Sequence, residues 1–123
     1  MKSRIFITGT SGIGKTTLAT YISEKYGLPY ISTSASKVWP KFGFKTHEEA
    51  HSKSVMFPDK GLMYQEDIVE ERIKALNGKL FWITDRSPID NIAYALLTLG
   101  HALTPEQTSY FIRKAFRMLD QCE

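Results

Sequence analysis

Cysteine is nearly absent from this sequence, because Cys122 is the only one among 123 residues. A single cysteine cannot form an internal disulfide, which excludes a disulfide-stapled scaffold and favours an intracellular, cytoplasmic setting. No stretch approaches the run of about 18 apolar residues that a membrane helix needs. The first residues, Met1 to Arg4, also lack the apolar core of a signal peptide. We therefore expect no membrane partner.

An excess of charge of one sign is also missing. The formal net charge is +3, and the basic residues are scattered rather than gathered in one run. The sequence therefore favours small anionic molecules over nucleic acid as the primary partner. Hydrophobic residues make up 42% and charged residues 24%, and there is no repeat or low-complexity segment, so we expect residues 1–123 to form a single globular domain.

The apolar patterns that are present predict strands alternating with helices. Strands are expected at residues 4–8, 28–32 and 79–84. Helices are expected from 15 to 26, from 46 onward, from 62 to 77, from 88 to 99 and from 105 onward, with a loop at 54–61. This order predicts an α/β fold around a parallel sheet of about three strands.

Buried faces are predicted for three of these helices from apolar residues at helical spacing. For the first helix the predicted face is Leu18, Ala19, Ile22 and Tyr26. For the helix from 88 to 99 it is Ile89, Ile92, Ala93, Leu96 and Leu97, and for the last helix it is Phe111, Ala115, Met118, Leu119 and Cys122.

A glycine-rich loop follows the first predicted strand. Residues 9–16 match G-x-x-x-x-G-K-[ST] at every fixed position, and a predicted helix follows. Glycines let successive backbone amides point at phosphate oxygens, whereas the alternative is a tight turn with a surface lysine. Lys15 would bind the β- and γ-phosphates of ATP, and the Thr16 hydroxyl would bind Mg²⁺. The predicted phosphate-binding residues are Gly9, Thr10, Ser11, Gly12, Ile13, Gly14, Lys15, Thr16 and Thr17.

A second motif lies at the end of the strand predicted at 79–84, where Asp85-Arg86-Ser87 leads directly into a helix. Parallel strands present their carboxyl ends to one crevice, so Asp85 and Arg86 are expected near the glycine loop. Together with Ala93-Tyr94, the two motifs resemble P-loop nucleoside and nucleotide kinases. The similarity is greatest to phage-type deoxynucleoside monophosphate kinases and small kinase-like AAA domains. It implies a three-layer P-loop NTPase fold, ATP and Mg²⁺ as cofactors, and nucleotides as small-molecule substrates.

The resemblance also implies roles for individual residues, with Lys15, Asp85 and Arg86 as the catalytic set. Asp85 would act near Mg²⁺, directly or through water, or would handle the acceptor, and Thr16 is the other metal candidate. Arg86 would stabilise charge between the donor and acceptor phosphates. The alternative for Asp85 and Arg86 is a surface ion pair. Ser87 is expected to be a helix N-cap, completed by Asp90.

The binding site for the phosphate acceptor is expected after the second predicted strand, where the resembled kinases bind the base and phosphate of their acceptor. The substrate-binding candidates are Lys37, Trp39, Lys41 and Arg86. Trp39 and its aromatic neighbours either stack on a base or pack over the core. Residues 30–45 contain no acid. This favours a monophosphate acceptor, whose oxyanion is already nucleophilic, over a hydroxyl that benefits from a general base.

Two histidines one helical turn apart, His47 and His51, follow this segment. Their spacing permits a metal site, but the pattern H-E-x-x-x-H differs from the H-E-x-x-H of zinc proteases. We expect them on a solvated helix face.

The resembled kinases have a five-stranded core and an arginine-bearing lid, whereas this sequence predicts no fourth or fifth strand and no arginine-rich lid. We therefore expect the N-terminal part of such a domain, with its first strand at an exposed sheet edge. That edge predicts a homo-oligomer or low stability of the chain alone. The functional hypothesis is phosphoryl transfer to a (deoxy)nucleoside monophosphate, by a phosphotransferase whose lid is supplied or dispensable. An ATP-binding module without catalysis and a nucleoside kinase are the alternatives.

Overall fold

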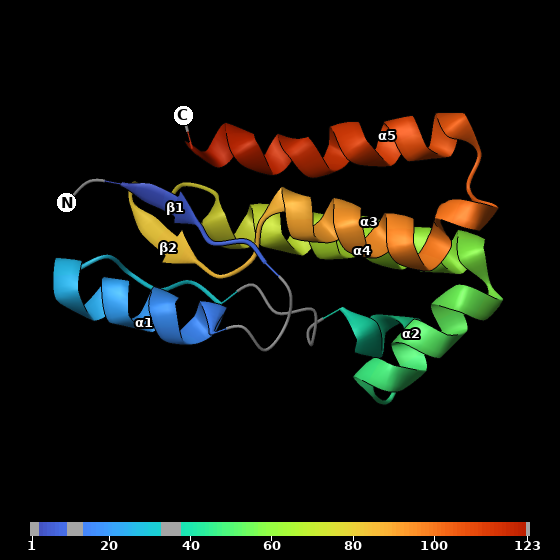
Figure 1. The fold of residues 1–123 in the computed structure, drawn as a ribbon, viewed down its shortest axis with the longest axis horizontal. Helices are drawn as coiled ribbons and strands as arrows, with labels where there is room; N and C mark the ends of the chain where they lie inside the picture. The colour runs from blue at the N-terminus through green and yellow to red at the C-terminus, as the bar shows by residue number, and fades with distance from the viewer. Residues whose placement is uncertain (1–2, 10–13, 33–37, 123) are drawn as a thin grey trace.

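The computed structural model describes residues 3–9, 14–32 and 38–122 (Figure 1). In these ranges, strands and α-helices follow one another as β1 (Arg4–Phe6), α1 (Lys15–Tyr26), α2 (His47–Met56), α3 (Pro58–Leu76), β2 (Trp82–Thr84), α4 (Pro88–Leu99) and α5 (Pro105–Phe116). Short 3₁₀ helices are η2 (Trp39–Phe42), η3 (Gly100–Ala102) and η4 (Arg117–Cys122). None of the helices in the described ranges is long and apolar enough to cross a membrane.

The sheet is parallel, as predicted, but smaller than predicted. β1 pairs with β2, with Ile5 opposite Ile83. The third predicted strand contributes only a single parallel bridge, from Tyr30 to Ile83. Here the Ile83 amide donates to the Pro29 carbonyl at 2.9 Å. To extend the pairing toward the N-terminus of this segment, Pro29 would have to donate an amide hydrogen, which proline lacks. The described residues thus form two strands and a bridge rather than three strands.

One face of this sheet is covered by α1 and the other by η4 at the end of the chain (Figure 1). Ala19 of α1 is fully buried against Ile83, and Ile22 packs beside it. The predicted buried face of α1 is only partly correct, because Leu18 and Tyr26 are 49% and 47% exposed. A sheet of two short strands covers a narrower strip of the helix than the apolar pattern suggests.

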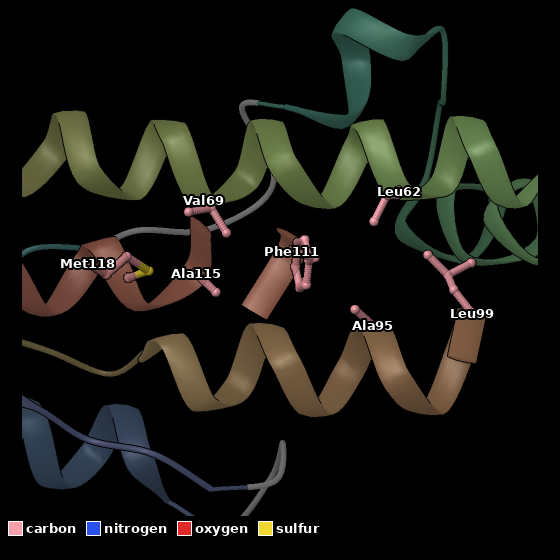
Figure 2. Packing of buried hydrophobic residues seen from close by; sticks show 7 residues of the cluster. All are labelled: Leu62, Val69, Ala95, Leu99, Phe111, Ala115 and Met118. Atoms are coloured by element: carbon pink, nitrogen blue, oxygen red, sulfur yellow. The ribbon is translucent and has the colours of Figure 1, made fainter. Parts of the chain in front are cut away.

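The largest core cluster lies between α3, α4, α5 and η4 (Figure 2). It contains Leu62, Val69, Ala95, Leu99, Phe111, Ala115 and Met118. Phe6 of β1 packs against this cluster and meets the Trp82 ring edge-on, with 4.9 Å between centroids. The buried stripe predicted for the last helix is confirmed at Phe111, Ala115 and Met118. It is wrong at Leu119, which is 42% exposed, and the Cys122 side chain lies outside the described residues.

The predicted buried face of α4 is confirmed only at Ile92, which is half-buried and packs against this cluster, and is wrong at its other four residues. Leu97 is 86% exposed and Ile89 is 56% exposed, and Ala93 and Leu96 are also exposed. The buried residues are Asn91, Ala95, Thr98 and Leu99 besides Pro88. Two of these are polar and are satisfied by hydrogen bonds, to Arg72 for Asn91 and to Tyr94 for Thr98. A pattern of apolar residues at helical spacing cannot predict a buried helix face that contains polar residues.

The predicted loop at 54–61 is also wrong, because only Phe57 separates α2 from α3. Pro58 occupies the first turn of α3, where its missing amide hydrogen is not needed. Gly61 lies inside α3, and a Cβ there would stand 2.9 Å from the Ser54 Cβ and carbonyl oxygen. The glycine therefore marks the close approach of two helices, not a break in the chain.

Three predicted helix starts are confirmed by their caps. Thr46 accepts a hydrogen bond from the Glu49 amide at 3.0 Å. Ser87 with Asp90, and Thr104 with Gln107, form complete capping boxes. The start of α4 is therefore set directly after Asp85 and Arg86.

Candidate functional site

The two motifs meet because β1 and β2 are parallel and end at the same edge of the sheet. β1 leads into Gly9, and β2 leads into Asp85 and Arg86. Of the predicted phosphate-binding residues, Thr10, Ser11, Gly12 and Ile13 lie outside the described residues. Gly9, Gly14, Lys15, Thr16 and Thr17 are placed, the last three in the first turn of α1.

The placed glycines have backbone conformations that suit glycine alone. Gly9 has φ of 145° and Gly14 has φ of 92°, values that a side chain makes costly. Gly14 directly precedes α1 and has no side chain to cap it, and the first amides of a helix have no partner within the helix and can bind an anion. These are the features that a phosphate-binding loop requires.

Lys15 folds back over the start of the loop. Its side chain is 7% exposed, and its Nζ donates to the Gly9 carbonyl oxygen at 2.5 Å. The same Nζ lies 3.8 Å from Asp90 Oδ1. The ammonium group is therefore held at the loop rather than extended into solvent.

Thr16 and Asp85, the two predicted metal ligands, are in direct contact. Thr16 Oγ1 donates to Asp85 Oδ2 at 2.5 Å, and Asp85 is 7% exposed. The Tyr30 hydroxyl also hydrogen-bonds to Asp85. A carboxylate beside a hydroxyl is the kind of oxygen donor pair that suits Mg²⁺.

The surroundings of Asp85 favour its ionised form. Burial alone would raise the pKa of this carboxyl. The hydrogen bonds from Thr16 and Tyr30, a backbone hydrogen bond and the charge of Arg86 outweigh it and lower the pKa. Tyr30 responds in the opposite sense, since burial and the hydrogen bond to Asp85 raise the pKa of its phenol. Asp85 is thus a carboxylate at neutral pH.

This lowered pKa predicts a pH dependence of stability. An aspartate whose folded pKa is below the unfolded value of about 3.9 stabilises the fold above that value. The contribution is lost as the pH falls through the folded pKa. The free energy of unfolding of the parent minus that of Asp85→Asn should therefore decrease from pH 6 to pH 2.5. Urea unfolding of both proteins across this range measures the difference, and a pH-independent difference contradicts the prediction.

Two arginines lie near this carboxylate. Arg86 is half-buried and makes no hydrogen bond or ion pair with the described part of the chain. Arg72 of α3 is buried at 7% exposure, and its guanidinium donates to Asn91 Oδ1. Burial and the charge of Arg86 lower the pKa of Arg72 to about 10. Arg72 is not among the predicted site residues, although its place between Val69 and Leu76 on the apolar side of α3 was a signal.

Asp90 makes more contacts than the helix cap that was predicted for it. Oδ2 accepts from the Ser87 amide at 2.8 Å, as the cap requires. Oδ1 accepts from Thr8 Oγ1 at 3.0 Å and from the Gly9 amide at 3.2 Å. These partners are separated from Asp90 by 82 and 81 positions in the sequence, so no short-range pattern could reveal the contacts.

Two of the acceptor-side candidates, Lys41 and Trp39, contact α3 or the cluster that it shares. Lys41 Nζ pairs with Glu71 Oε1 at 2.9 Å. Trp39 is half-buried and packs against the cluster of Val38, Phe44, Ala50, Tyr64 and Ile68. Lys37 lies outside the described residues. Of the two alternatives for the aromatic residues, packing over the core describes this structure.

The two histidines do not gather around a common partner. Both histidines are exposed, as predicted, and His51 Nδ1 lies 2.8 Å from the Tyr94 hydroxyl. The described ranges contain no group of three His, Cys, Asp or Glu side chains that could hold a metal ion.

Comparison with known proteins identifies related chains. The chain is 37% identical over 71 residues to the adenylate kinase of Caldicellulosiruptor saccharolyticus, covering 58% of this chain and 32% of that protein. It is 35% identical over 89 residues to the adenylate kinase of Acetivibrio thermocellus, covering 69% of this chain and 40% of that protein. No solved structure matches. The chain thus spans about a third of the length of the first of these curated relatives.

A family model described as "AAA domain" matches residues 4–118, which include both motifs and every α-helix of the fold. The resemblance to P-loop kinase-like proteins is thereby confirmed at the level of the family. The finer similarity to phage-type deoxynucleoside monophosphate kinases stays a prediction. Because the match covers nearly the whole chain, the protein belongs to the AAA domain family.

Proposed function

We propose that this chain contributes one P-loop kinase-like domain that binds Mg²⁺-ATP and transfers the γ-phosphate to a nucleoside monophosphate. The observation that supports it most is the hydrogen bond from Thr16 to Asp85 at the carboxyl edge of a parallel sheet, with the neighbouring Lys15 held at the Gly9 carbonyl oxygen. The similarity to adenylate kinases supports a nucleotide acceptor. The reaction converts ATP and a monophosphate into ADP and a diphosphate.

The residues present fit the donor side of this reaction. Thr16 and Asp85 offer the oxygen atoms that would hold Mg²⁺, and bound Mg²⁺ would neutralise charge on the phosphates. Lys15 brings a positive charge to the loop. Glycine conformations at Gly9 and Gly14 leave room for the phosphates to approach the backbone.

Arg86 supports the acceptor side. It stands next to Asp85 in the chain, is half-buried, and makes no ion pair within the described ranges. A guanidinium suits a phosphate because it can bind two oxygens at once. Because phosphoryl transfer depends on positioning and charge rather than on covalent chemistry, Arg86 is assigned the stabilisation of charge between the donor and acceptor phosphates.

A phosphotransfer panel tests the proposal. The full chain is incubated with Mg²⁺-ATP and either nucleoside monophosphates or nucleosides, in ribose and deoxyribose forms, and the products are separated by ion-exchange chromatography. We expect equal amounts of ADP and a nucleoside diphosphate. Arg86→Ala should reduce turnover by roughly a hundredfold or more while ATP still binds, whereas Arg113→Ala, which removes an exposed arginine on α5, should change neither.

The panel also separates the alternatives. An ATP-binding module without transfer is the second candidate, because the contacts of Lys15, Thr16 and Asp85 all lie on the donor side of the reaction. ATP binding with no product from any acceptor would establish that candidate. Transfer to nucleosides alone would establish a nucleoside kinase, and either result would overturn the proposal.

A further inference from the structure

We propose that Asp90 is a positioning residue that fastens the entrance of the glycine loop to the first turn of α4. The inference rests on the proposed function for its ATP-binding readout, but its structural content does not depend on that function. It goes beyond the helix cap, which needs only the contacts between Asp90 and Ser87.

The carboxylate of Asp90 accepts hydrogen bonds from two segments of the chain and forms an ion pair with a third. Thr8 Oγ1 and the Gly9 amide donate to Oδ1 at 3.0 and 3.2 Å, and Lys15 Nζ lies 3.8 Å from the same oxygen. The Ser87 amide donates to Oδ2 at 2.8 Å. The Asp90 side chain is only 15% exposed, so water competes weakly for these contacts.

This arrangement fixes the Gly9 residue from both sides. Its amide is held by Asp90, and its carbonyl oxygen accepts the Lys15 ammonium at 2.5 Å. Gly9 has a φ of 145°, a conformation accessible to glycine but not maintained by any regular structure. The two hydrogen bonds therefore set the direction in which the loop leaves β1.

Only a carboxylate can serve every donor around this position. An ionised carboxylate accepts on both oxygens, whereas asparagine replaces one of them with an NH₂ group that can only donate. If the asparagine oxygen kept the Ser87 amide, its NH₂ group would face the Gly9 amide. The opposite orientation would abandon the cap. In either orientation, asparagine loses either the hydrogen bond from the Gly9 amide or the hydrogen bond from the Ser87 amide.

A loop already held in one conformation binds its ligand more tightly, because ordering does not have to accompany binding. Asp90 joins this loop to the α4 end of the Asp85-Arg86 turn, so donor-side and acceptor-side groups keep one relative placement. The negative charge of Asp90 acts in the opposite sense by repelling phosphate. The inference requires the positional effect to be the larger of the two.

Three variants of the full chain test the inference by calorimetric titration with Mg²⁺-ATP and by thermal melting. Asp90→Asn should raise the Kd for ATP roughly tenfold or more, since charge-assisted hydrogen bonds hold the loop. Thr8→Val, which removes one loop-side donor, should raise Kd by a smaller factor. Ser87→Ala is the matched control, because it breaks the same capping box without touching the loop. It should lower Tm and leave Kd unchanged.

An unchanged or lower Kd for Asp90→Asn would overturn the inference, as would a rise in Kd for Ser87→Ala equal to that for Asp90→Asn. If Asp90→Asn does not fold, Thr8→Val decides alone, and an unchanged Kd overturns the inference. If the parent binds no ATP, the proposed function fails. Amide hydrogen exchange at Gly9 then decides: Asp90→Asn must accelerate it and Ser87→Ala must not.

Discussion

Mg²⁺-ATP should lose most of its stabilising effect on the folded chain when Lys15 is replaced by methionine. A ligand that binds only the folded state adds about 2.7 kcal/mol when present at about 100 times its Kd. Hydrogen bonds from a charged group contribute about 1.5–3 kcal/mol each, so the loss of Lys15 should remove more than half of the gain. Urea unfolding with and without Mg²⁺-ATP measures the gain in each protein.

Methionine is the informative replacement at this position. The Lys15 side chain is 7% exposed, so alanine would leave a void as well as remove the charge. Methionine preserves the volume of the stem, while the hydrogen bond to the Gly9 carbonyl oxygen is lost. The variant is therefore expected to be somewhat less stable without ligand, and the ATP-induced gain within each protein is the quantity to compare.

Lys25→Met provides a control on the same helix. Lys25 lies in the last turn of α1, is exposed, and carries the same charge at the opposite end from the loop. Its replacement should leave the ATP-induced gain intact. If Lys15→Met retained the full gain, ATP would bind elsewhere, and the proposed function would be wrong.

Local patterns predicted the parts of this site that depend on neighbouring residues. Gly14 and Lys15 stand at a strand–loop–helix junction because the glycine motif and the helix pattern are both short-range signals. Ser87 caps α4 for the same reason. The meeting of Thr16 with Asp85 was also expected, since parallel strands end at one edge. These inferences need only the order of the elements.

The errors have the opposite character, because they involve contacts between distant parts of the chain. Asn91 faces inward because Arg72 of another helix satisfies its amide oxygen, which an apolar count within α4 cannot detect. Asp90 reaches Gly9 only after β1 and the start of α4 are brought together. When the partner of a residue lies far along the chain, the sequence pattern reveals only the local role of that residue, which for Asp90 is the helix cap.

Gly61 is the clearest case of such a misreading, and it carries the second large prediction. Its place in a segment with Pro58 suggested a loop, whereas it lies in α3 against Ser54 of α2. A Cβ at Gly61 would lie 2.9 Å from the Ser54 Cβ and carbonyl oxygen and 3.0 Å from the Ser54 Cα. Two of these three atoms belong to the backbone, so a change of side-chain rotamer cannot relieve the overlap.

Gly61→Ala should therefore destabilise the fold, by about 1–3 kcal/mol as is typical of overpacked cores, even though alanine favours helix. Gly100→Ala is the matched control, because Gly100 has a helical φ of −54° and nothing within 4 Å of the added Cβ. There alanine should be neutral or stabilising by up to about 1 kcal/mol. Urea unfolding of both variants measures the difference. Equal stability of Gly61→Ala and the parent would mean that α2 and α3 separate at little cost, and that Gly61 is not needed for their close approach.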